Sequence, residues 1–236
     1  MGVARRRRPR LLFEEGRGTA IAIDHVLLAV ADLEEGGREV HRRWGLTALP
    51  GGRHPGAGTA NLIVPLGPDY LELIAIVDAV EAEGNPLSRR VTQALESGST
   101  FATWAVRVDD LAAVERRLTA AGLSVTAPRD GSRLRPDGVL LRWRSLHLAG
   151  GLDPALPFFI EWLVAPADHP GAREVTHPAG PVSLRRLVLS SPQPRGLEER
   201  LRTILGGELP LDVIAGEREE PVALLLDASG REIELR

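Results

Sequence analysis

The sequence contains neither cysteine nor lysine, so all 29 basic residues among its 236 residues are arginines. Without cysteine the chain can form no disulfide, and it has no thiolate to act as a nucleophile or to bind zinc or an iron–sulfur cluster. Without lysine it has no amine for a Schiff base, no anchor for pyridoxal phosphate and no P-loop lysine. No nucleotide or pyridoxal-phosphate cofactor is therefore expected, and a GC-rich genome is the simplest explanation for the arginines.

Long hydrophobic runs are also missing. No stretch approaches the length of a membrane span, and no apolar segment of a secretory signal follows the first residues. We therefore expect a cytoplasmic protein with no membrane partner. Residues 1–20 are expected to form a basic, flexible arm, because Arg5–Arg8 and Arg10 lie within it. Such an arm can bind nucleic acid, but a solvated tail is the simpler interpretation, so nucleic acid is not an expected partner.

Three segments of the chain repeat one pattern, a short strand followed by an amphipathic helix, beginning at Ile21, Phe101 and Ser183. Three short apolar runs follow each helix, so the repeating unit is β-α-β-β-β. The expected strands are 46–49, 60–66 and 70–77, then 123–127, 139–148 and 157–164, and finally 211–214, 222–226 and 232–235. The predicted organisation is an arm (1–20), a first module (21–78), a linker helix (79–99), a second module (100–164), a loop (165–182) and a C-terminal module (183–236).

Alternation along each strand predicts which side chains share a face of the sheet. In the alignment of the repeats, His25 corresponds to Thr103. A charged group inside an apolar strand is costly unless it is paired, hydrated or bound to a metal. Polar side chains that gather on one face therefore predict a polar cavity. The residues placed on this face are His25, Asn61, Glu72, Arg142, Arg144 and Glu161.

Each of these residues also has a simpler interpretation. His25 can be satisfied by a backbone carbonyl or by Glu72 alone. Glu161 can form a structural ion pair with Arg142 or Arg144, and these two arginines can either balance charge or clamp an anionic substrate. His54 lies in the glycine-rich segment 51–58, which is either a lid that binds substrate or a mobile connector. The other histidines are interpreted as surface residues: His41, His147, His169 and His177.

Several of these segments resemble the vicinal oxygen chelate superfamily, which includes glyoxalase I, extradiol dioxygenases, methylmalonyl-CoA epimerase and bleomycin-resistance proteins. The segments that carry the resemblance are Asp24-His-Val26, Gly51–Thr59, Tyr70-Leu-Glu-Leu73, Ser132–Gly138, Leu141-Arg-Trp-Arg144 and Leu156–Trp162. The resemblance covers residues 21 to about 164 and is closest to the glyoxalase-like subgroup. It implies an α+β fold, in which paired βαβββ modules form a curved, cup-like mixed sheet with helices outside. The C-terminal module would be a third half-unit.

In metal-dependent members of this superfamily, the ligands come from the first and last strands of each paired module. Carried over by position, these are His25, Glu72, Thr103 and Glu161. Thr103 departs from the pattern because a threonine is a poor ligand. The resemblance implies that His25, Glu72 and Glu161 hold a divalent ion, with Mn²⁺, Fe²⁺, Co²⁺, Ni²⁺ or Zn²⁺ suiting such a mixed set.

Two functions remain open from the sequence. One is a metal-dependent lyase, isomerase or dioxygenase that acts on a small oxygenated, possibly anionic metabolite, with Glu72 and Glu161 as catalytic residues. Its substrate would be oriented by Asn61, Arg142, Arg144 and His54. The alternative is a non-catalytic protein of the same fold that binds a small drug or metabolite. In either case the C-terminal module lacks a partner module, so pairing with the same unit of a second chain would give a homodimer.

Overall fold

A computed structural model of the chain describes residues 21–150 and 153–236. The basic arm expected at residues 1–20 lies outside these ranges. Within them, no helix has both the length and the apolar character that crossing a membrane requires.

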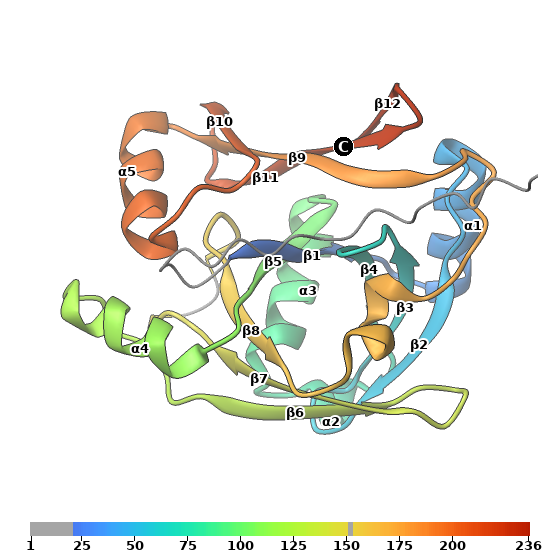
Figure 1. The fold of residues 1–236 in the computed structure, drawn as a ribbon, viewed down its shortest axis with the longest axis horizontal. Helices are drawn as coiled ribbons and strands as arrows, with labels where there is room; N and C mark the ends of the chain where they lie inside the picture. Colours follow the sequence, from blue (N-terminus) through green and yellow to red (C-terminus); the bar gives the residue numbers. More distant parts are fainter. Residues whose placement is uncertain (1–20, 151–152) are drawn as a thin grey trace, which may run out of the picture.

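The first module contains four strands and one long helix (Figure 1). Its elements are β1 (Ala22–Ala29), α1 (Leu33–Trp44), β2 (Leu49–His54), β3 (Thr59–Pro65) and β4 (Tyr70–Ile76). Helix α1 begins where the Asp32 carboxylate accepts a hydrogen bond from the Glu35 amide, and it ends at Gly45, whose φ of 64° is left-handed. Strand β1 pairs with β4 in parallel, and β4, β3 and β2 follow as antiparallel neighbours.

The second module repeats this topology. Its elements are β5 (Phe101–Arg107), α4 (Leu111–Ala120), β6 (Arg129–Leu134), β7 (Leu140–Leu146) and β8 (Phe158–Trp162), and α2 (Ala79–Ala82) and α3 (Pro86–Ser97) precede it. The strand predicted at 123–127 is wrong. Only an isolated bridge joins Val125 to Leu148, and the strand that pairs with β7 begins at Arg129. In the first module, likewise, the strand predicted at 46–49 lies at β2 instead.

Antiparallel pairing of β1 with β5 joins the modules into one eight-stranded sheet, in the order β2-β3-β4-β1-β5-β8-β7-β6. The sheet curls until its two edge strands meet. The close approach is seen at Gly52 of β2, where an added Cβ would lie only 2.7 Å from the Leu134 carbonyl oxygen of β6. Figure 1 shows this nearly closed cup, with β6 passing beneath it. Helix α3 packs across β1 and β5 at one end of the cup, where Val91 and Ala94 contact Leu27 and Ala105. The predicted α+β cup is confirmed.

The C-terminal segment has the predicted order of elements but a different arrangement of strands. Its elements are β9 (Val182–Ser191), α5 (Pro194–Leu205), β10 (Leu211–Ala215), β11 (Glu220–Ala228) and β12 (Arg231–Leu235). The strand order is β10-β9-β11-β12, so the first strand does not pair with the last as it does in the two cup modules. The connection from β8 runs through two short 3₁₀ helices, η1 (Pro166–Asp168) and η2 (Pro170–Ala172).

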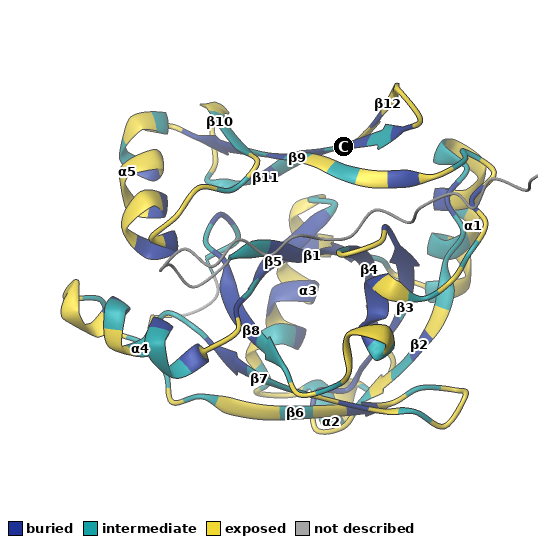
Figure 2. Ribbon diagram, viewed as in Figure 1, coloured by how far each residue is buried: buried dark blue, intermediate teal, exposed yellow. Residues whose placement is uncertain are grey.

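The C-terminal sheet covers the convex face of the cup. Its residues Leu187 and Leu224 belong to the same hydrophobic core as Trp104 and Val106 of β5. Figure 2 shows the buried residues of β1 and β8 in the middle of the molecule, and exposed residues on the outer sides of α5 and β6. The core therefore lies between the two sheets, and the concave side of the cup is left for the cavity described next.

Candidate functional site

The concave side of the cup encloses a cavity of about 350 Å³. This volume lies within the range of small-molecule sites in proteins. The first module contributes a group of neighbouring polar side chains to its wall, with His25 on β1, His54 at the end of β2, Asn61 on β3 and Glu72 on β4. His25, Asn61 and Glu72 are on the face where the sequence predicts them, whereas His54 ends a strand and not a loop.

A bulge in β1 brings two neighbouring polar residues together. Ile23 pairs with Val106 and His25 with Ala105, so Asp24 is an extra residue in β1. A bulge interrupts the alternation of side chains along a strand. As a result the Asp24 carboxylate lies within 2.7 Å of the His25 Nδ1 atom, although the two residues are adjacent in sequence.

The Asp24 carboxylate is fully buried and accepts hydrogen bonds from several parts of the chain. Besides His25, its donors are His169 Nε2 at 3.0 Å, Trp162 Nε1 at 3.2 Å and Arg107 Nη1 at 3.3 Å. Burial raises the pKa of Asp24, but the hydrogen bonds from His169 and His25 outweigh it, so the pKa lies below its usual range. An ionised carboxylate only accepts hydrogen bonds, so the His25 proton is assigned to Nδ1 and Nε2 carries a free lone pair.

Glu72 faces this lone pair across the cavity wall. Its Oε2 atom lies 3.6 Å from His25 Nε2, too far for a direct hydrogen bond. Its Oε1 atom accepts a hydrogen bond of 2.8 Å from Asn61 Nδ2. Burial by itself raises the pKa of Glu72. The nearby His54, His25 and Arg133 and the hydrogen bond from Asn61 together lower it by more, so the pKa lies below its usual value and the group is ionised. His25 Nε2 and Glu72 Oε2 are therefore two acceptors placed to share one donor from a ligand.

His54 lies beside Glu72, as the third polar group at this end. Its Nε2 atom is 3.7 Å from Glu72 Oε1, and its Nδ1 atom is 2.9 Å from the Thr59 hydroxyl. Burial lowers the pKa of His54, so the imidazole is neutral near pH 7. Of the two interpretations of segment 51–58, the structure favours a site residue over a mobile connector, because His54 ends strand β2 and lines the cavity.

Arg133 on β6 completes the polar wall and is not foreseen from the sequence. It is 3% exposed, and its Nη1 atom donates a hydrogen bond to Asn61 Oδ1. The contact exists because residue 51 is glycine, since a Cβ there would overlap Asn61 Oδ1 and Arg133 Nη1. Strand β6 has a single apolar side chain, Leu134, so neither the strand nor its inward residue stands out in the sequence.

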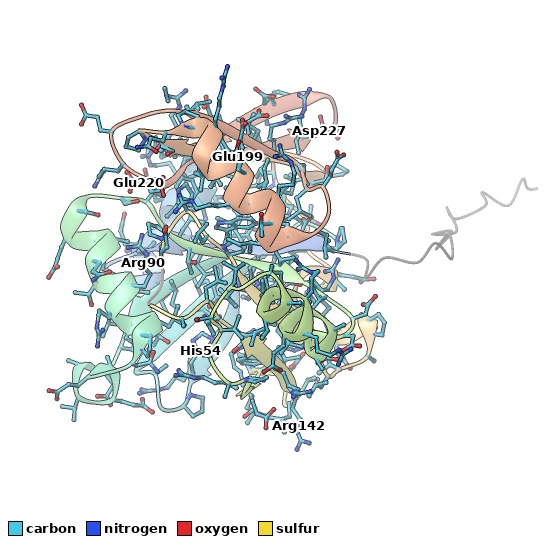
Figure 3. All side chains as sticks on the ribbon, turned by 90° about the vertical axis from the view of Figure 1, so that its left-hand side faces the viewer. His54, Arg90, Arg142, Glu199, Glu220 and Asp227 are labelled. Carbon is cyan, nitrogen blue, oxygen red and sulfur yellow. The ribbon has the colours of Figure 1, made fainter. Side chains whose placement is uncertain are left out.

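The second module does not contribute the charged residues expected of it. The expectation that Arg142, Arg144 and Glu161 face the cavity is wrong. The residues that alternate with them along β7 and β8 line it instead: Trp143, Ser145, Phe158, Ile160 and Trp162. Arg144 Nη1 lies 3.7 Å from Glu161 Oε2, which is the ion pair considered as the simpler interpretation. Arg142 is exposed, and Figure 3 shows it at the lower edge of the molecule, while His54 lies further inside.

Comparison with known proteins identifies the family. The sequence matches the model of the glyoxalase-like domain over residues 23–205, well over half of the chain. The chain belongs to the glyoxalase-like domain family. No protein of curated function matches the sequence of this glyoxalase-like chain.

Solved structures share the fold of the glyoxalase-like chain at low sequence identity. A hypothetical protein from Staphylococcus aureus is 15% identical with a TM-score of 0.73, and the match covers 88% of this chain and 91% of that one. Methylmalonyl-CoA epimerase from Mycobacterium tuberculosis is 24% identical with a TM-score of 0.42, over 60% and 86% of the two chains. The Mn(II)-bound glyoxalase from Novosphingobium aromaticivorans is 16% identical with a TM-score of 0.49, over 85% and 63%.

The metal site implied by the superfamily does not fit this glyoxalase-like chain. The two modules are related through the β1–β5 pair, in which His25 is opposite Ala105 and Leu27 is opposite Thr103. Thr103 is thus the counterpart of His25. Because Glu72 lies beside Leu27 and Phe158 lies beside Ala105, Phe158 is the counterpart of Glu72.

The second module therefore supplies threonine and phenylalanine where a metal-dependent relative would supply ligands. Glu161, the expected third ligand, is on the opposite face of the sheet. Across residues 21–150 and 153–236, no group of three His, Cys, Asp or Glu side chains is arranged to hold a metal ion. We derive no chemistry from a metal for this reason.

Three histidines interpreted as surface residues are in fact inside the molecule. His169 is 7% exposed and binds Asp24, and His177 is 7% exposed and lies between the Thr47 amide and the Pro65 carbonyl. His147 lines the cavity, where burial and the nearby Arg129 lower its pKa to about 4. Their partners lie far away in the sequence, so local spacing could not reveal them.

Proposed function

We propose that this glyoxalase-like chain is an enzyme of the lyase or isomerase class that moves a proton on a small oxygenated molecule. The observation that carries the proposal is the pair of acceptors in the cavity wall. In the neutral imidazole of His25, the hydrogen bond to Asp24 places the proton on Nδ1, so Nε2 is the acceptor that faces the ionised Glu72 across 3.6 Å.

His25 is the base in this proposal. Imidazole accepts protons efficiently near neutral pH, and a carboxylate bound to the other ring nitrogen orients the ring and stabilises the imidazolium that forms. The proton would come from a carbon next to a carbonyl group of the ligand. The electron pair of the broken C–H bond would then move to the carbonyl oxygen and give an enolate.

Two further groups serve the same step. Glu72 would accept a hydrogen bond from a ligand hydroxyl and would also stabilise the protonated His25 beside it. Arg133, which lies behind Asn61, would supply positive charge near the enolate in a site shielded from water. Transfer of the hydroxyl proton to the enolate oxygen, with return of the carbon proton to the former carbonyl carbon, would complete the isomerisation of a hydroxy ketone. Departure of a leaving group with its electron pair from the carbon next to the enolate would instead complete an elimination.

The test uses a simple ketone as a probe. 2-Hydroxyacetophenone incubated with the protein in D₂O is expected to exchange its C–H protons next to the carbonyl faster than in buffer alone, as followed by ¹H NMR. Replacing a general base commonly costs about 10²–10⁴-fold. His25→Ala and Glu72→Gln are therefore expected to lower the rate at least about 100-fold.

Arg142→Ala is the matched control, because Arg142 points away from the cavity, and it is expected to keep the full rate. Exchange is also expected to persist in EDTA, since the residues of the site do not form a metal-ligand set. No exchange above buffer, or exchange that survives His25→Ala, would overturn the proposal. Strict dependence on added Mn²⁺ or Zn²⁺ would overturn its metal-free form.

The second candidate function is non-catalytic binding of a small molecule. One observation favours it: the second module places three large aromatic side chains in the cavity wall, those of Trp143, Phe158 and Trp162. Tight binding of a cavity ligand without any proton exchange would support this function over the enzyme.

A further inference from the structure

The cavity has two chemically different ends, one polar and one rich in aromatic rings. The first module supplies His25, His54, Asn61 and Glu72. The second module supplies aromatic rings in mutual contact. Trp143 and Trp162 have ring centroids 5.5 Å apart, and His147 stacks on Phe158 with centroids 5.0 Å apart and an angle of 17°.

The difference is sharpest at the positions that the modules share. Across the β1–β5 pair, Thr103 replaces His25 and Phe158 replaces Glu72. A symmetrical ligand with two similar polar ends would leave one end against Phe158, which cannot accept a hydrogen bond as Glu72 does. The cavity therefore fits a ligand with one polar end and one apolar end.

The charge of the cavity wall favours a neutral ligand. The buried charges near the polar end are the Glu72 carboxylate and the Arg133 guanidinium, which have opposite sign. The exposed Arg129 and Asp130, which also line the cavity, have opposite sign as well. His54 and His147 have lowered pKa values and are neutral near pH 7. Arg142 and Arg144, which could have clamped an anion, lie outside the cavity.

We propose that the ligand of this cavity is a neutral molecule with a planar aromatic body of one or two rings and one polar head that carries a hydroxyl group. The body lies against Trp143, Phe158 and Trp162. The hydroxyl donates to Glu72 Oε2, which leaves His25 Nε2 facing the rest of the head. The placement of the head rests on the proposed function, but the placement of the aromatic body does not.

Ring geometry gives the aromatic body an advantage over an aliphatic one. The rings of Trp143 and Trp162 are tilted by 56° to each other, so a flat ligand can meet one face-on and the other by its edge. Offset and edge contacts between aromatic rings contribute about 0.5–1.5 kcal/mol beyond the burial of their area. A saturated ring of the same outline loses this contribution.

Titration calorimetry with four related probes tests each part of the proposal. 2-Naphthol has the aromatic body and the neutral hydroxyl head and is expected to bind most tightly. Naphthalene lacks the head and is expected to bind at least about tenfold more weakly, because it loses a hydrogen bond to a charged acceptor. Decahydro-2-naphthol keeps the head without aromatic rings, and 2-naphthoate is an anion, and both are expected to bind several-fold more weakly than 2-naphthol.

Two variants locate the bound probe. Phe158→Leu and Trp143→Phe are expected to weaken 2-naphthol binding about three- to tenfold, and thermal unfolding checks that both variants are folded. Trp44→Phe is the matched control, because the Trp44 indole contacts the Glu234 carbonyl far from the cavity, and it is expected to leave binding unchanged.

Equal binding of decahydro-2-naphthol, tighter binding of 2-naphthoate, or no effect of Phe158→Leu would overturn the inference. These outcomes are separable from those of the proton-exchange test. If 2-naphthol binds as expected but no exchange occurs, the proposed function fails and the ligand class stands. If exchange occurs but the saturated or anionic probe binds best, only the ligand class fails.

Discussion

Asp24 accepts hydrogen bonds from four side chains that come from separate parts of the chain. The donors are its neighbour His25, Arg107 of β5, Trp162 of β8 and His169 in the segment 165–182. A carboxylate with no solvent contact is stable only when it is fully paired in this way. Asp24 therefore fixes the orientation of His25 and also holds the segment 165–182 against the cup.

Asp24→Asn is expected to destabilise the protein by about 3–5 kcal/mol, because an amide cannot accept all four donors and leaves buried positive or N–H groups unpaired. It is also expected to lower proton exchange, since the His25 tautomer is no longer fixed. Urea unfolding and the exchange assay measure the two effects. The control is Asp109→Asn at an exposed position, with an expected change within about 0.5 kcal/mol. Equal stabilities of the two variants would contradict this role of Asp24.

Asp69, in the turn between β3 and β4, gives a pH-dependent prediction. Burial raises its pKa to about 7, and its Oδ1 atom has no hydrogen-bond partner among the described residues. The folded state thus keeps a proton that the unfolded state loses near pH 4, so the contribution of Asp69 to stability falls as pH rises from about 4 to 7. Asp69→Asn removes the ionisable group and, with it, this fall in stability with rising pH.

The Asp69→Asn variant is expected to be more stable than the parent at pH 8, by about 1–2 kcal/mol after allowance for partial solvent contact. At pH 5 the difference is expected to be clearly smaller, because most of the fall in stability lies between pH 5 and pH 7. Urea unfolding at the two pH values checks the difference. An equal effect at both pH values would show that ionisation of Asp69 is not its cause.

At the scale of elements, the meeting of β2 and β6 decides the shape of the polar end. Gly51→Ala is expected to push Arg133 away from Asn61, since the added Cβ overlaps both contacting atoms. We expect a loss of about 1–3 kcal/mol in stability and a drop in proton exchange.

Gly196→Ala is the matched control for Gly51→Ala. Gly196 lies in helix α5, and the nearest atoms to an added Cβ are 3.8 Å away. Alanine favours a helix over glycine by up to about 1 kcal/mol, so this variant is expected to be slightly more stable. Thermal unfolding compares the two variants. A Gly51→Ala protein as stable as the parent would contradict the close packing of β2 on β6.

Elements with strong local signals are predictable from this sequence. Helix α3 begins where Asn85 caps it before Pro86 and ends at the left-handed Gly98, and β4 begins at Tyr70 as expected. Strand β6 is not predictable, because its sequence Arg-Asp-Gly-Ser-Arg-Leu is almost wholly polar and its pairing with β7 decides its position.

The prediction of which side chains on β7 and β8 face the cavity fails for a different physical reason. The sequence Phe158-Phe-Ile-Glu-Trp162 is apolar on both faces apart from one glutamate, so alternation gives little contrast. A polar cavity wall is the wrong assumption for the second module, whose inward residues are aromatic. In the first module, where the wall is polar, the same reasoning places His25, Asn61 and Glu72 correctly.

At the scale of the whole molecule, the two sheets share one hydrophobic core. Leu187 and Leu224 of the C-terminal sheet pack in the same cluster as Trp104 of the cup. The sequence predicts a homodimer because the C-terminal module lacks a partner, but its apolar residues are covered by the cup of the same chain. The homodimer stays a prediction, which light scattering tests.

The shared core predicts one cooperative unfolding transition for the cup and the C-terminal sheet together. Neither part keeps its apolar face covered after the other unfolds, so a partly unfolded state is unfavourable. Differential scanning calorimetry is expected to show a single peak, with equal calorimetric and van't Hoff enthalpies. Two resolved peaks would show that the sheets unfold independently.

The unequal contributions of the two modules to the cavity also have an evolutionary consequence. Substitutions at positions such as Trp143, Phe158 and Ile160 change the shape of the apolar half and leave the Asp24–His25 pair untouched. A lineage can therefore acquire new ligands by drift in one repeat while selection preserves the other. A mutant library confined to Trp143, Phe158 and Ile160 should accordingly yield altered preference far more often than lost turnover.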